Sequence, residues 1–141
     1  MSVDFVDSNI FIYLLDETNP RKRDTARQVV RTALAEGSAC ISHQVIQETL
    51  QVMTGKLKVP VTFEDARRFL EETLVPLWRV MPSTKLYQRS LEVQQRYRYG
   101  FYDSLIIAAA LEGGCRRLLS EDFQHGQQIE GLRIEDPFRE L

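Results

Sequence analysis

Short apolar segments alternate with longer amphipathic segments along the chain, and this alternation constrains the fold more than any other feature. Five segments have the length and composition of buried strands: residues 3–6, 39–42, 76–81, 117–120 and 132–135. The intervening segments carry apolar residues at helical spacing, and the cap residues Asn19 and Ser83 precede two of them. Strands that alternate with helices pair in parallel. The sequence therefore predicts an α/β fold with a largely parallel sheet.

Length and composition limit the class of protein. The length suits one domain, residues 1–141, and contents of 43% hydrophobic and 27% charged residues are those of a globular protein. No apolar run approaches the roughly 20 residues that span a bilayer. The N-terminus lacks a basic region followed by an apolar stretch, so we expect a cytoplasmic protein without a membrane partner. The net charge of −2 excludes a generally basic nucleic-acid coat.

Four acidic residues lie beside apolar segments, where a carboxylate is out of place without a function: Asp7, Glu48, Asp103 and Asp122. Asp7 and Asp122 follow the first and fourth predicted strands, and Ser120 is placed to donate a hydrogen bond to Asp122. In α/β sheets, binding sites form beyond the carboxyl ends of the strands. Clustered carboxylates repel one another, and a hard divalent cation relieves that repulsion. The pattern predicts a Mg²⁺ or Mn²⁺ site and indicates a metal-dependent nuclease.

Each acid also has an interpretation that needs no metal. Asp7 could cap a helix, and Glu48 could reach water from the edge of an apolar helical stripe. Asp103 could interact with a helix dipole and free backbone N–H groups. Glu121 could replace Asp122 as the inward acid. It is improbable that four acids stand at corresponding ends of successive strand–helix units by coincidence. The site interpretation is therefore favoured for the set as a whole.

The sequence offers few residues for other kinds of catalytic or binding site. His43 and His125 are the only histidines, and neither lies in a metal-binding pair or near a candidate nucleophile. No Gly-rich phosphate-binding loop is present. Cys40 and Cys115 lie in apolar segments without metal-ligand spacing, so we expect reduced, buried thiols. Catalysis therefore falls to the carboxylates.

Several short motifs together resemble a known family. They are FVDSN at residues 5–9, IQE at 46–48, the segment 102–110, LLSEDF at 118–123 and the tail 126–138. In this order and spacing they resemble the PIN-domain ribonucleases, in particular the VapC-type toxins of bacterial toxin–antitoxin pairs. The resemblance covers essentially the whole chain.

The resemblance implies a PIN-like three-layer sandwich whose five-stranded parallel sheet has the order 3-2-1-4-5, and it implies a homodimer. It also implies an endoribonuclease that hydrolyses RNA phosphodiester bonds with one or two Mg²⁺ or Mn²⁺ ions, as the toxin partner of a cognate antitoxin protein. The implied metal ligands match Asp7, Glu48, Asp103 and Asp122, with Ser8, Asn9 and Ser120 in support. The sequence departs from the family pattern at Ser104, His125 and Asp136, which leaves the choice of substrate open.

The segment 96–102 interleaves arginines with aromatic residues immediately before the third acid. Such a segment suits stacking on unpaired bases and pairing with phosphates, so Arg96, Arg98 and Tyr99 are candidate RNA contacts. The other aromatic residues of the segment could instead belong to the core, and an antitoxin could use the same surface.

Other functions are compatible with parts of the pattern. An aspartyl-nucleophile phosphatase would need a second acid two residues after Asp7, where Asn9 stands. A receiver domain would need a pair of acids near the first strand and a lysine late in the chain, and neither is evident. A non-catalytic PIN-fold module that binds RNA or protein, and a nuclease that acts on DNA, stay open as alternatives.

Overall fold

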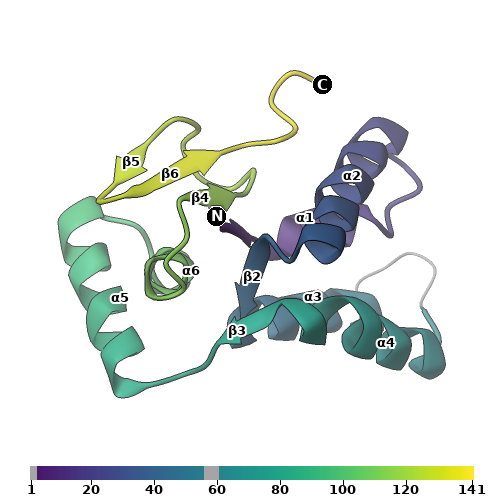
Figure 1. Cartoon of the computed structure of the whole chain (residues 1–141), viewed down its shortest axis with the longest axis horizontal. Helices are drawn as coiled ribbons and strands as arrows, with labels where there is room; N and C mark the ends of the chain where they lie inside the picture. Colours follow the sequence, from purple (N-terminus) through teal and green to yellow (C-terminus); the bar gives the residue numbers. More distant parts are fainter. Residues whose placement is uncertain (1–2, 56–60) are drawn as a thin grey trace.

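A six-stranded sheet forms the centre of the computed structural model, which describes residues 3–55 and 61–141. The strands are β1 (Asp4–Val6), β2 (Ala39–Ser42), β3 (Trp78–Val80), β4 (Arg117–Leu119), β5 (Gln128–Ile129) and β6 (Leu132–Glu135). Their order is β3-β2-β1-β4-β6-β5, and every pair is parallel except β5 with β6 (Figure 1). The predicted order 3-2-1-4-5 is therefore confirmed, with β6 as its fifth strand.

The short strand β5 is an addition that the sequence analysis did not predict. It pairs antiparallel with β6 across a two-residue turn at Glu130 and Gly131. Glu130 has a φ of 56°, the left-handed conformation that tight hairpin turns require. A strand of 2 residues is too short for an alternating pattern, so β5 carries no periodic signal in the sequence.

The helices occupy the connections between the strands, and side chains cap them where predicted. They are α1 (Ser8–Tyr13), α2 (Pro20–Glu36), α3 (His43–Gly55), α4 (Phe63–Phe69), α5 (Thr84–Tyr97) and α6 (Phe101–Glu112). The side chains of Asn19 and Ser83 accept backbone hydrogen bonds at the starts of α2 and α5. Gly37 ends α2 with a φ of 60°. Within residues 3–55 and 61–141, no helix combines the length and the apolar character needed to cross a bilayer.

Two helix boundaries differ from the prediction. The sequence predicts one continuous helix through about residue 74, but α4 gives way to a π-helical turn at Leu70–Leu74 and a 3₁₀ turn at Val75–Leu77. Pro76 has no backbone N–H and cannot continue an α-helix, so the chain turns away there. The sequence predicts a helix that starts after Asp103, but α6 begins at Phe101, because the extended backbone of Gly100 serves as its N-cap. Asp103 therefore lies inside the first turn of α6 rather than ahead of it.

The helices form two layers on the two faces of the sheet. The chain passes from β1 to β2 to β3 in one direction along the sheet and then returns to β4. Because parallel crossovers are right-handed, α1 to α4 lie on one face while α5 and α6 lie on the other (Figure 1). The helix α6 is buried over residues 104–110, since apolar residues occupy all of its sides. This topology makes β1 and β4 neighbours, so the residues that follow them meet.

Candidate functional site

Asp7 stands directly after β1 and is buried, with 3% of its surface exposed. Its Oδ1 accepts a hydrogen bond of 2.8 Å from the backbone N–H of Ser8, so Asp7 caps α1. Its Oδ2 accepts a hydrogen bond of 2.7 Å from the hydroxyl of Ser120, which follows β4. Asp7 therefore caps α1, and the same carboxylate also links the ends of the adjacent strands β1 and β4.

Ser120 donates its proton to Asp7 and not to the Asp122 carboxylate, contrary to the expectation from sequence. The backbone N–H of Asp122 instead donates to the Ser120 hydroxyl over 3.1 Å. A hydroxyl has one proton to donate, and the buried carboxylate receives it.

The side-chain amide of Asn9 connects Asp7 with Asp122. Its Nδ2 lies 3.4 Å from Oδ2 of Asp7 and 3.1 Å from Oδ2 of Asp122. The same nitrogen is 3.0 Å from the Ser120 hydroxyl. The Asn9 carbonyl oxygen accepts from the backbone N–H of Glu121 over 3.4 Å. A single buried amide thus holds together the residues that follow β1 and β4.

The structure separates the two neighbouring acids that follow β4. Asp122 faces Asn9, whereas the carboxylate of Glu121 lies 2.8 Å from Nζ of Lys22. Glu121 also accepts a hydrogen bond of 2.6 Å from the Tyr13 hydroxyl. Because a lysine already neutralises Glu121, Asp122 is the acid that stays available for a ligand.

Glu48 reaches the other acids from α3 and is held at both of its oxygens. Ser8 donates to Oε1 over 3.1 Å, and the amide of Gln44 donates to Oε2 over 3.3 Å. The Gln44 amide nitrogen also donates to the carbonyl oxygen of Tyr102 over 3.1 Å. Gln44 therefore links Glu48 to the residue that precedes Asp103. Gln44 was not among the site residues predicted from the sequence, although its spacing of four residues from Glu48 puts both on one helix face.

Charge repulsion between neighbouring carboxylates involves all four acids. Burial raises the pKa of Asp7 to about 7, and repulsion from Glu48 and Asp122 adds to this increase. Hydrogen bonds from Ser120 and from the backbone of Ser8 act in the opposite direction and lower the pKa of Asp7. Partial burial also raises the pKa of Asp103, with a further contribution from the Asp122 charge. The group therefore carries repulsion that a cation would relieve.

The four acids fit a hard divalent cation in donor type and charge, because all of them offer carboxylate oxygens. They are not gathered into a finished coordination shell. Among residues 3–55 and 61–141, no three acidic, histidine or cysteine side chains lie close enough together to count as a ready-made cation site. Hydrogen bonds of Ser8 link Asp7 with Glu48, and those of Asn9 link Asp7 with Asp122, while Gln44 connects Glu48 only to the backbone next to Asp103. A bound ion would therefore have to draw acids from several elements toward itself.

The candidate RNA contacts differ in the solvent exposure of their side chains. Arg96 and Arg98 are exposed, with the Arg96 guanidinium 5.6 Å from the ring centre of Tyr97. Tyr99 is half-buried: its ring packs edge-on against Phe123 at 5.3 Å, and its hydroxyl donates to Gln127. The most exposed aromatic ring beside the acids belongs instead to Tyr102, which is 68% exposed.

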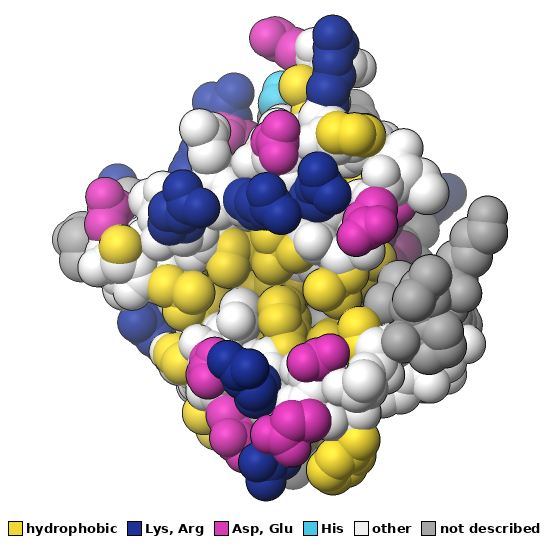
Figure 2. Space-filling model, turned by 90° about the vertical axis from the view of Figure 1, so that its right-hand side faces the viewer, with side chains coloured by type: hydrophobic (Ala, Val, Ile, Leu, Met, Phe, Trp, Pro, Cys, Tyr) yellow, Lys and Arg dark blue, Asp and Glu magenta, His cyan; other side chains and the backbone are white. Residues whose placement is uncertain are grey.

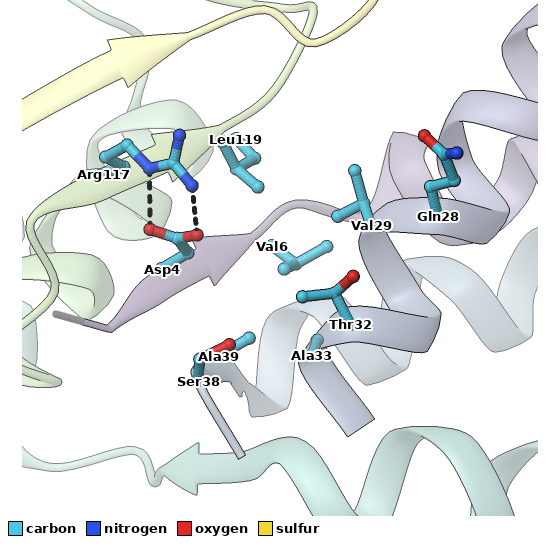
Figure 3. Close-up of a pocket in the computed structure, with 10 residues that line it drawn as sticks. All are labelled: Asp4, Val6, Gln28, Val29, Thr32, Ala33, Ser38, Ala39, Arg117 and Leu119. Atoms are coloured by element: carbon cyan, nitrogen blue, oxygen red, sulfur yellow. Dashed lines mark hydrogen bonds and ion pairs between the residues drawn. The ribbon is translucent and has the colours of Figure 1, made fainter. Parts of the chain in front are cut away.

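Clefts and an apolar hollow lie on the surface of the part of the chain that the structure describes. Figure 2 shows one face on which hydrophobic side chains fill a hollow between a row of Lys and Arg side chains and a mixed group of acidic and basic side chains. Near the acids, a cleft of about 330 Å³ is lined by residues of α1 and α3, including Ser8, Ile12 and Glu48. A separate cleft of about 240 Å³ lies between α2 and the sheet, and Figure 3 shows the Asp4–Arg117 ion pair at its edge. None of the four acids lines this second cleft.

Comparison with known proteins identifies the family. A family model described as PIN domain matches residues 5–127, which carry all four acids. The chain belongs to the PIN-domain family. PIN nucleases generally use divalent metals, in agreement with the donor type of this site. Among functionally curated proteins, none matches the chain.

Solved structures of toxin–antitoxin proteins share the fold. A toxin–antitoxin complex from Klebsiella pneumoniae is 22% identical, with a TM-score of 0.67 over 97% of this chain and 98% of that chain. DNA-bound VapBC from Salmonella typhimurium is 20% identical, with a TM-score of 0.69 over 97% and 99%. VapC20 of Mycobacterium tuberculosis, described as a sarcin–ricin loop cleaving toxin, is 19% identical, with a TM-score of 0.60 over 84% and 91%. The structural neighbours of this PIN domain are thus VapC toxins of VapBC complexes.

Proposed function

We propose that this PIN-domain protein is a divalent-metal-dependent endoribonuclease and the toxin of a toxin–antitoxin pair. The observation that carries the proposal is the hydrogen-bonded network joining the residues that follow β1 and β4 with Glu48 of α3. These carboxylates lie at the carboxyl ends of parallel strands, where α/β proteins bind their ligands. We take residues 1–141 as the single domain that carries this activity.

The residues that would hold one or two Mg²⁺ or Mn²⁺ ions are Asp7, Glu48, Asp103 and Asp122. When bound, such an ion supplies positive charge for the developing oxyanions and activates water for hydrolysis of a phosphodiester. The task of the protein is to keep the carboxylates oriented. Ser120 and Asn9 orient Asp7 and Asp122, while Ser8 and Gln44 orient Glu48.

The substrate we propose is RNA with unpaired bases, met in the cytoplasm. Tyr102 offers an exposed ring in the residue next to Asp103, where a base could stack. Arg96, Arg98 and Tyr99 remain candidate contacts, and the two exposed arginines suit phosphates better than the packed Tyr99 ring suits a base. The RNA-cleaving activity named for VapC20 supports RNA over DNA.

The partners we propose are a cognate antitoxin and a second copy of the chain. Structural neighbours were crystallised as toxin–antitoxin complexes. The apolar hollow bordered by basic and acidic side chains in Figure 2 has the character of a protein-binding surface. An antitoxin segment seated there would explain why hydrophobic side chains stay uncovered on this face.

The decisive experiment is cleavage of a mixed panel of RNA and DNA by purified protein with Mn²⁺, with Mg²⁺ and with EDTA. We expect cleavage of RNA that needs the metal and that is lost in Asp103→Asn. The matched control is Asp24→Asn, the same substitution at an exposed position of α2. Cleavage of DNA alone would favour the DNA nuclease, and an absence of both cleavage and Mn²⁺ binding by calorimetry would favour a non-catalytic module.

A further inference from the structure

Two cysteine thiols touch in the interior, at a place that takes no part in the acid network. The sulfur atoms of Cys40 and Cys115 lie 3.1 Å apart, although 75 positions separate the residues in the chain. Both cysteines are free and buried, with exposed fractions of 0% and 6%. A disulfide has a sulfur–sulfur distance of about 2.05 Å, so the pair is about one ångström from bonding distance.

The fold brings the thiols together through the connection between α6 and β4. Cys40 lies in β2, opposite Phe5 of β1, and Cys115 lies immediately before β4. Gly113, at the end of α6, packs directly on the Cys40 side chain. A Cβ atom at Gly113 would come within 2.9 Å of the Cys40 sulfur, so the close packing depends on this glycine. The contact is therefore part of how α6 meets the sheet and not an encounter of mobile loops.

The surroundings give the two sulfurs different chemistry. The hydrogen bond between the two thiols lowers the pKa of Cys40, and the positive charge of Arg79 acts in the same direction, while burial and the negative charge of Asp4 act against them. The same hydrogen bond and burial raise the pKa of Cys115. Cys40 is therefore the sulfur with more thiolate character, which is the form that attacks an oxidant.

We propose that Cys40 and Cys115 form an oxidisable dithiol, which closes to a reversible intramolecular disulfide when the protein meets a hydroperoxide. The Cys40 thiolate attacks the peroxide oxygen, the O–O bond breaks, and with one proton taken up the products are a sulfenic acid and water. The Cys115 sulfur then attacks the Cys40 sulfur, an S–S bond forms, and the sulfenic oxygen leaves as a second water. In sum, two thiols are oxidised by two electrons and one hydrogen peroxide is reduced to two waters.

The bond would connect segments that carry two of the site acids. The strand β2 leads into α3, which bears Glu48, and α6 bears Asp103 and ends just before Cys115. Closing a loop of this length removes many conformations from the unfolded chain. The oxidised protein should therefore unfold at a higher temperature than the reduced protein, and dithiothreitol should reverse the increase.

The test treats reduced, folded protein with hydrogen peroxide, blocks remaining thiols with N-ethylmaleimide in denaturant, and measures the intact mass. We expect wild-type monomer to lose two hydrogens and to take up no maleimide, with both thiols recovered after dithiothreitol. Cys40→Ala and Cys115→Ala should form no bridge and show no rise in melting temperature after peroxide.

Several outcomes would overturn the proposal. They are two reactive thiols in folded wild type after peroxide, a bridge that forms only in denaturant, a bridge between two molecules, or oxidation of one cysteine to a sulfinic acid. The thiol count on wild type decides these outcomes even if a variant fails to fold. The test requires no nuclease activity, so its result is independent of the proposed function.

Discussion

Two aspartates at the two ends of β1 have opposite surroundings. Asp4 receives a bidentate contact from Arg117, with distances of 2.8 Å to Nε and 2.6 Å to a terminal nitrogen (Figure 3). Asp7 is more deeply buried, yet it receives hydrogen bonds only from a hydroxyl, an amide and a backbone N–H within the described residues. The two ends of one strand thus hold one acid that an arginine neutralises and one that has other acids, but no cation, beside it among the described residues.

The difference separates a structural acid from a candidate binding residue. A buried carboxylate without a cation weakens the fold, and natural proteins keep such groups mainly at functional sites. Asp4 forms an ion pair with Arg117 of β4, so its charge is balanced within the folded chain without a ligand. Asp7 has the environment of a group whose partner is a ligand.

The largest effect is expected from Asp7→Asn on RNA cleavage. The substitution removes one negative charge at nearly constant shape, so we expect the rate with Mn²⁺ to fall by at least about 100-fold, since changes around metal ligands alone cost roughly 10–100-fold. Asp4→Asn, the same substitution at the other end of β1, should leave the rate largely unchanged. Comparison of initial rates measures both. Equal losses in the two variants would remove the distinction between the two acids.

Asp7→Asn should also stabilise the metal-free protein above neutral pH. The pKa of Asp7 is about 7 in the folded protein, against its ordinary value of 3.8 in an unfolded chain. The folded state therefore holds its proton more tightly, and the ionised carboxylate lowers stability progressively as pH rises from about 4 to about 7. The full difference is at most roughly 4 kcal/mol.

Denaturant unfolding in EDTA across this pH range measures the effect. The wild type should lose stability as pH rises, and the slope should be smaller in Asp7→Asn. Asp103→Asn provides a comparison, because Asp103 is exposed whereas Asp7 is buried. An unchanged slope in Asp7→Asn would show that other groups control the pH dependence.

Asn9→Ala should reduce cleavage by roughly 10–100-fold, because the amide that orients Asp7 and Asp122 is lost. The matched control is Asn19→Ala, which removes the cap of α2. The control should lower stability by about 1 kcal/mol and leave cleavage intact. Rates per folded molecule, with unfolding measured in parallel, separate the two effects. A similar activity in both variants would argue against a role of Asn9 in the site.

The smallest effect is expected from Asp4→Asn on stability. Its ion pair with Arg117 is partly exposed, and such pairs contribute about 1 kcal/mol or less. The loss should shrink as salt concentration rises, because salt screens the pair. Urea unfolding at low and high salt tests this. A loss of several kcal/mol that does not depend on salt would mean that Asp4 supports packing rather than charge balance.

Local patterns in the sequence were enough to predict most of the elements of the fold. The strand at Ala39–Ser42, the helix caps at Asn19 and Ser83, and the largely parallel pairing all agree with the structure, whereas the strand order was predicted from the family resemblance. Apolar periodicity and capping act over a few residues, so they can be recognised without knowledge of distant neighbours. The two-residue strand β5 and the π-helical turn after α4 were missed, since each depends on how its segment meets the rest of the chain.

The sequence by itself determined the α/β fold, the four candidate acids and the position of Asp7 and Asp122 after two of the strands, because these follow from residue type and short spacing. The tertiary structure alone decided that Ser120 donates to Asp7, that Lys22 neutralises Glu121, and that Gln44 reaches the Tyr102 carbonyl. It also brought the two thiols into contact. These contacts join residues that lie 58 to 113 positions apart, and no local preference specifies them. Only the packing of helices against a sheet of fixed strand order determines which of these side chains meet.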